Sequence, residues 1–176
     1  MKSIQKKDIV TVVLIGLFIS IVLRLFVFDV FIVKGNSMVP TIQSGDVVFI
    51  HKLAYAFGAP RRGDIIVAIP RTMREMVIKR VVALPGERVE ILHNRVVIKK
   101  DRTDTGEVLK EEYLSLPDTP DVGETVLNLD PEEYFVLGDN RYLSTDSREL
   151  GPIDGWKIKG KVVFDLNFRK LSVKPF

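Results

Sequence analysis

The chain has 176 residues, of which 46% are hydrophobic and 28% are charged, with no cysteine and a formal net charge of +3. This length suits one modest domain with appendages, and the lack of cysteine excludes disulfides, thiol nucleophiles and Cys-ligated metal sites. Residues 1–34 hold five Lys or Arg against two Asp, whereas the remainder holds 21 basic and 21 acidic residues. Because the remainder is neutral, the basic excess does not indicate nucleic-acid binding.

The first predicted element is a membrane anchor over residues 9–28. Arg24 is the single ionisable residue in this stretch of twenty, which as a helix would span about 30 Å, the thickness of the hydrocarbon core of a bilayer. Arg24 lies near the far end, where its long side chain can reach the interface. A buried core helix would be amphipathic, but this stretch is apolar on all sides.

Charges before the anchor predict its orientation. Lys2, Lys6 and Lys7 precede the apolar run, so the positive-inside tendency places residues 1–8 in the cytoplasm and residues 29–176 outside the cell membrane, with a single crossing. A cleavable signal peptide is the alternative interpretation. The apolar character continues to Val33 without an Ala-x-Ala site, which favours an uncleaved anchor.

Behind the anchor the pattern is typical of an all-β domain, because short apolar runs are separated by Gly, Pro, Asn and Asp. We predict a hairpin whose turn is His93-Asn94, a polar excursion over residues 101–131 that is not a second domain, and a loop over residues 141–155. Further strands are predicted within residues 45–54, 62–70, 76–84, 133–140 and 157–166.

Ser37 and Lys79 are the residues that could carry chemistry. A serine between Gly, Asn and Met is usually a turn residue, and a nucleophilic serine needs a base. His51 lies at a strand end and His93 in a predicted turn, and neither has a metal-like neighbour at helical spacing. Lys79 lies inside the apolar segment VIKRVVAL, where burial can lower a lysine pKa from about 10.4 to about 8. From these residues alone, turn serine or nucleophile, and solvated lysine or base, both stay open.

Four blocks behind the anchor, GNSMVPTI, RGDIIVAI, IKRVVALPGE and GDNRYLSTDSR, resemble in their order the type I signal peptidases. The resemblance runs from the anchor to about Gly151. It implies a mainly β fold, with an antiparallel coiled sheet or partial barrel behind one transmembrane helix. It also implies a membrane-bound serine endopeptidase, without cofactor or metal, that removes signal peptides from exported preproteins after Ala-x-Ala-like sites, at the lipid bilayer and beside the secretion translocon. Ser37 matches the nucleophile of the family and Lys79 its general base.

The last block supplies the residues that the resemblance places around this dyad. Ser144 matches a hydroxyl that orients the lysine amine, and Asp146 and Arg148 match a salt bridge that braces the loop. Asp139 and Asn140 are supporting residues. The chain departs from some members in having Gly35 where they have a serine that helps to bind the oxyanion, so we expect the backbone N–H of Ser37 to take this role.

The resemblance also suggests substrate pockets for small side chains. The residues that match these pockets are Val33, Met38, Ile42, Val77 and Ile78. Packing in the core would explain their apolar character equally well. Two other functions stay open. A self-cleaving Ser-Lys regulator would share the dyad but should lack an anchor, and a non-catalytic membrane-tethered β domain would bind a secreted partner.

Overall fold

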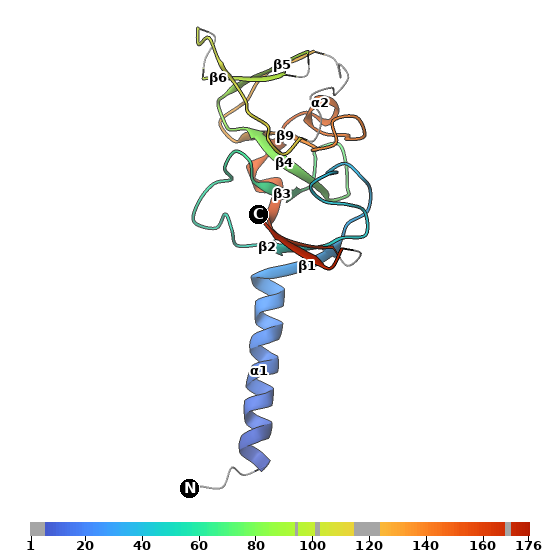
Figure 1. Cartoon of the computed structure of the whole chain (residues 1–176). Coiled ribbons are helices and arrows are strands. Elements are labelled where there is room, and N and C mark those ends of the chain that lie inside the picture. Colours follow the sequence, from blue (N-terminus) through green and yellow to red (C-terminus); the bar gives the residue numbers. More distant parts are fainter. Residues whose placement is uncertain (1–5, 94, 101–102, 115–123, 168–169) are drawn as a thin grey trace.

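The computed structural model describes residues 6–93, 95–100, 103–114, 124–167 and 170–176. A single long helix, α1 (Lys6–Phe26), stands at one end of a β domain. Strands β1 and β2 lie next to the helix, and β5 and β6 lie at the far end of the domain (Figure 1). The chain is therefore a helix followed by β structure, as predicted.

Helix α1 carries the predicted anchor. Its segment Ile9–Phe26 is long and apolar enough to cross a membrane, and none of it is buried against the domain. The helix ends at Phe26 and not at residue 28, because β1 (Phe28–Ile32) begins to pair with β2 (Val47–His51) at Phe28. Lys2, on which the predicted orientation partly rests, lies outside the described residues.

The main sheet has eight strands, and all of its pairs are antiparallel. Their order is β1-β2-β11-β3-β4-β9-β10, and β12 pairs with β11. The sheet curls into a half-barrel, which confirms the predicted fold class. Besides β1 and β2, its strands are β3 (Ile65–Ala68), β4 (Val77–Ala83), β9 (Glu133–Leu137), β10 (Ile153–Asp154), β11 (Ile158–Asn167) and β12 (Ser172–Pro175).

A second, four-stranded sheet has the order β7-β6-β5-β8. The predicted hairpin is confirmed as β5 (Arg88–Leu92) paired with β6 (Arg95–Lys99), and His93 has φ 46°, a left-handed turn conformation, whereas Asn94 lies outside the described residues. The predicted polar excursion supplies β7 (Glu107–Val108) and β8 (Thr125–Asn128). Residues 101–102 and 115–123 of this excursion lie outside the described residues.

The predicted loop 141–155 contains regular structure. Helix α2 (Ser147–Leu150) begins after Asp146, whose side chain accepts a hydrogen bond from the backbone N–H of Arg148, a typical N-cap. Strand β10 follows, and a 3-10 turn, η1 (Gly155–Lys157), leads into β11. The loop prediction was wrong at α2 because a four-residue helix is too short to show a periodic pattern.

Candidate active site

Ser37 lies in the segment that joins β1 to β2. Hydrogen bonds between Val33 N and Asp46 O (2.8 Å) and between Gly45 N and Val33 O (2.9 Å) close the ends of this segment. Met38 and Ile42 are buried in the core formed with β2 and β3. Val33, which precedes Ser37, is buried in the same core, so packing on both sides of the turn holds the backbone of Ser37 in place.

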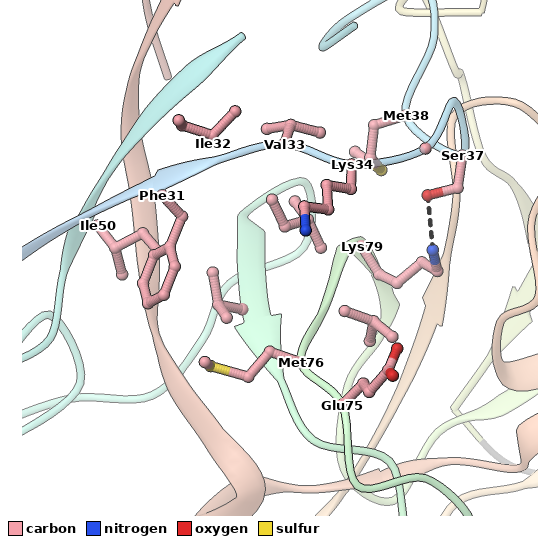
Figure 2. A pocket seen from close by; sticks show the side chains of 14 residues that line it. Phe31, Ile32, Val33, Lys34, Ser37, Met38, Ile50, Glu75, Met76 and Lys79 are labelled. Carbon is pink, nitrogen blue, oxygen red and sulfur yellow. Dashed lines mark hydrogen bonds between the residues drawn. The ribbon is translucent and has the colours of Figure 1, made fainter. Parts of the chain in front are cut away.

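Lys79, in β4, lies against Ser37. Its Nζ is 2.8 Å from Ser37 Oγ, within hydrogen-bond distance (Figure 2). Only 4% of Lys79 is exposed. Burial lowers the pKa of its amine, the Arg148 charge lowers it further, and the Asp146 and Asp139 charges oppose both effects. The amine is therefore easier to deprotonate than that of an ordinary lysine.

The segment 138–148, which we call the 138–148 loop, packs beside this pair. Asp146 is fully buried, and its carboxylate binds Arg148 Nε at 2.8 Å and Nη2 at 2.9 Å, which forms the predicted salt bridge. The same carboxylate accepts from Gly138 N at 3.0 Å. Arg148 Nη2 donates to Arg141 O at 2.9 Å. These bonds tie one end of the loop to the other.

Ser144 lies close to Ser37 but does not hold the amine in this structure. Its Oγ is buried and makes no hydrogen bond within the described residues, so the predicted bond to Lys79 is not formed. Gly138 lies between the two serines. A Cβ at Gly138 would clash with Ser144 Oγ and with Ser37 O. The glycine is therefore required for the close approach, and sequence reasoning did not identify it as a site residue.

The backbone N–H of Ser37 is available to bind an oxyanion, whereas the N–H groups of Asn140 and Gly35 are occupied. Asn140 N donates to Ser37 O at 3.0 Å, and Gly35 N donates to Ser44 Oγ at 3.3 Å. The N–H of Ser37 makes no hydrogen bond to any residue that the structure describes. At position 35 the glycine has φ 95°, a left-handed conformation that glycine adopts without strain. The backbone N–H of Ser37 can therefore donate to an oxyanion, whereas Gly35 has no side chain that could do so.

A groove of about 350 Å³ begins at the Ser37–Lys79 pair. Figure 2 shows this pair at one end of the groove and Phe31, Ile50 and Met76 at the other. Four of the predicted pocket residues line the groove, namely Val33, Met38, Val77 and Ile78. Ile42 does not: it is fully buried in the core that Val48 and Ile65 also form. Its assignment to a substrate pocket is corrected to core packing.

A buried charge network that joins the 138–148 loop to β4 and to residues 111–113 was not predicted. Arg80 Nη2 binds Asp139 Oδ2 at 2.6 Å, and the guanidinium of Arg80 lies 4.0 Å from the centre of the Tyr113 ring. Arg141 binds Glu111 through both terminal nitrogens, and Tyr113 Oη donates to Glu111 Oε1 at 2.6 Å. The carboxylates of Asp139 and Glu111 are thus bound to arginine. Within the described residues, no group of three or more His, Asp or Glu is placed to hold a metal ion.

The fold and the site together define the class of protein to which the chain belongs. A serine hydroxyl against a buried lysine amine, at the end of a groove in a curled antiparallel sheet, is the arrangement that a serine hydrolase with a lysine base requires. The chain belongs to the family described as signal peptidase, peptidase S26, whose model matches residues 6–166. It is therefore a peptidase of the signal peptidase family.

Named relatives agree with this assignment. The chain is 38% identical to the signal peptidase I of Bacillus caldolyticus, over 81% of this chain and 81% of that protein. It is 32% identical to a probable signal peptidase I-1 of Synechocystis, over 90% of this chain and 81% of the relative. The crystal structure of a signal peptidase I from Enterococcus faecalis superposes with a TM-score of 0.51 at 29% identity, covering 59% of this chain and 97% of that chain.

Proposed function

We propose that this protein removes signal peptides from exported preproteins, with Ser37 as nucleophile and Lys79 as general base. The observation that carries the proposal is the 2.8 Å contact between Ser37 Oγ and Lys79 Nζ. Family membership and the apolar helix α1 favour this function over a self-cleaving regulator. The close contact also favours catalysis over the non-catalytic alternative, which needs no such pair.

In the proposed reaction, neutral Lys79 takes the proton of Ser37 as Oγ attacks the carbonyl carbon of the scissile bond. The resulting oxyanion accepts a hydrogen bond from the N–H of Ser37. Lys79 then gives its proton to the leaving amine, and an ester between Ser37 and the signal peptide remains. A water molecule that loses its proton to Lys79 hydrolyses this ester and regenerates the hydroxyl.

The groove supports a preference for small side chains near the cleavage site. Its walls next to Ser37 are apolar, since Val33, Met38 and Ile78 line it. Val33 and Met38 are also buried in the core, so the walls have little freedom to retreat from a large side chain. We infer that Ala-x-Ala-like sequences fit best, because a methyl group fills a shallow apolar pocket without displacing its walls.

The proposed location is the cell membrane, with the N-terminus in the cytoplasm and the β domain outside. Its support is the predicted positive-inside orientation of α1. In this orientation the groove faces the side on which exported preproteins emerge. Signal peptides and the bilayer are then the immediate partners, and the secretion translocon is the neighbour that delivers the substrate.

The test is cleavage of a purified preprotein in detergent or vesicles. The protein should cut the preprotein with an intact Ala-x-Ala site and leave unchanged a matched preprotein whose two alanines are replaced by bulky residues. Ser37→Ala and Lys79→Arg should each lose nearly all activity, because the first lacks the attacking oxygen and the second cannot release a proton. Circular dichroism should show both variants folded. Substantial turnover by folded Lys79→Arg would falsify the role of Lys79 as base.

A further inference from the structure

A second hollow, of about 490 Å³, lies next to the nucleophile and shares no lining residue with the groove. Gly35, Ser37 and Met38 line the groove, whereas their chain neighbours line the hollow. The two hollows therefore lie on different sides of the same segment. The residues that line the second one are Asn36, Val39, Gln43, Ser44, Asn140 and Leu143.

The second hollow differs from the groove in its chemistry. No charged side chain lines it, whereas Lys34, Glu75 and Lys79 line the groove. Within the described residues, the side-chain amides of Asn36 and Gln43 have no hydrogen-bond partner, and Asn140 Oδ1 accepts from Leu143 N at 3.3 Å. A side-chain amide can both donate and accept. The amides of Asn36 and Gln43 can therefore bind the N–H and C=O groups of an extended peptide.

The position of helix α1 gives the direction of a bound peptide. From Ser37 the groove runs to Phe31 and Ile32 in β1, which starts directly after the helix. A smaller hollow of about 230 Å³ shares Phe31 and extends to Asp29. If the apolar part of a signal peptide lies in the membrane beside α1, its following residues reach Ser37 along this path. The residues after the scissile bond must then leave on the other side of Ser37.

We propose that the second hollow binds the first residues of the mature protein, on the leaving side of the scissile bond. This inference rests on the proposed function. Asn36 and Gln43 bind the peptide backbone, and Leu143, which is 69% exposed, contacts a side chain of the mature protein. Because the two amides bind backbone groups that every peptide has, the hollow accepts many sequences and distinguishes chiefly between the presence and the absence of a downstream peptide.

The experiment compares two substrates with the same residues before the scissile bond. One continues with several residues of a mature protein, and the other ends in a small chromogenic amine such as p-nitroaniline. In the double variant Gln43→Ala/Leu143→Ala, kcat/KM for the extended substrate should fall about tenfold relative to its value for the chromogenic one. Leu53→Ala, which also truncates an exposed leucine but outside both hollows, should leave the ratio unchanged. An equal loss for both substrates, or no loss for either, overturns the proposal.

A binding measurement separates this proposal from the proposed chemistry. In the Ser37→Ala background, a peptide that spans the scissile bond should bind about tenfold more tightly than one that stops at it, and the double variant should remove the difference. Equal binding of the two peptides to Ser37→Ala overturns the subsite alone. Failure of the parent protein to cleave either substrate instead contradicts the proposed function, whatever the binding result.

Discussion

Lys79 determines the pH dependence that we expect of this site. Because burial lowers the pKa of its amine, the neutral form that can accept a proton is present at lower pH than for an exposed lysine. The rate should rise as pH increases through this lowered pKa and then level off. The position of this rise is therefore a measure of the charges around the amine.

Arg148→Gln should shift the pH at which the cleavage rate increases to a higher value. The Arg148 charge helps to lower the pKa of Lys79, and its loss leaves the Asp146 carboxylate, which raises the pKa, without its partner. The measurement is kcat/KM on one preprotein across the pH range, compared with Arg88→Gln, whose partner Glu90 lies in the second sheet. If Arg148→Gln lowers only the plateau and leaves the midpoint in place, the arginine does not act on the lysine.

Gly138→Ala should abolish cleavage with only a modest loss of secondary structure. Its Cβ would clash with Ser37 O and Ser144 Oγ, so one of the two serines must move. Gly58→Ala is the matched control, because a Cβ there meets nothing within 4 Å. Activity and circular dichroism should be measured on both. Full activity in Gly138→Ala would show that the spacing of the two serines is not critical.

The ion pair between Glu111 and Arg141 joins residues 103–114 to the 138–148 loop. Both side chains are almost completely buried, and removing one member of a buried ion pair typically costs about 3–5 kcal/mol. Glu111→Gln should lower the melting temperature and the activity, whereas Glu112→Gln, the same change at an exposed neighbour, should do neither. Thermal unfolding followed by circular dichroism gives the comparison. Equal melting temperatures would mean that the pair contributes nothing to stability.

Strand β11 contains a carboxyl group whose stability effect should depend on pH. Burial and the neighbouring Asp46 charge raise the pKa of Asp165 to about 6, against a small opposing effect of Lys174. A carboxyl with a raised pKa stabilises the fold while it is protonated, and this contribution is lost as pH rises from about 4 to about 6. Asp165→Asn stays neutral, so it should raise the melting temperature near about pH 7.5 and have less effect near about pH 5. The same increase at both values would exclude titration as the cause.

The strands could be predicted from sequence where apolar and polar residues alternate or where apolar residues follow one another without interruption. In β5 and β6 every second side chain is buried, and in β3 and β9 all are. Strand β7 has two exposed residues and α2 has four residues in all. Such short elements form only because neighbouring strands or a capping aspartate stabilise them, so no local pattern indicates them.

The pair Ser37 and Lys79 could be proposed from sequence for two reasons. A nucleophilic serine needs a base, and the four sequence blocks resemble those of the type I signal peptidases. Other features could not. Arg80 and Asp139 are 59 residues apart in sequence, and nothing local to either residue indicates the pairing. Ile42 has the same apolar character as the groove residues, and only the packing of its turn decides that it is buried.

The whole molecule is predicted to lie in the membrane with its N-terminus in the cytoplasm and its β domain outside. Trypsin added to wall-stripped cells should digest the β domain, since many of the exposed Lys and Arg lie outside α1 and the domain should be extracytoplasmic. A cytoplasmic marker protein must stay intact in the same sample. Digestion only after the cells are permeabilised would reverse the proposed orientation.

The connection between α1 and β1 has a consequence for where the enzyme can cut. Val27 alone separates the two elements, and Lys52 holds the junction, with its N donating to Val27 O at 2.8 Å and its Nζ to Leu25 O at 2.5 Å. Ser37 follows Phe26 by eleven residues, which can span at most about 36–40 Å even when fully extended. If α1 crosses the bilayer as proposed, this length limits how far from the bilayer surface Ser37 can lie. In that orientation a peptide bond farther out than this length would be beyond the reach of Ser37, and the distance from the membrane would restrict the cleavage position together with the side chains around it.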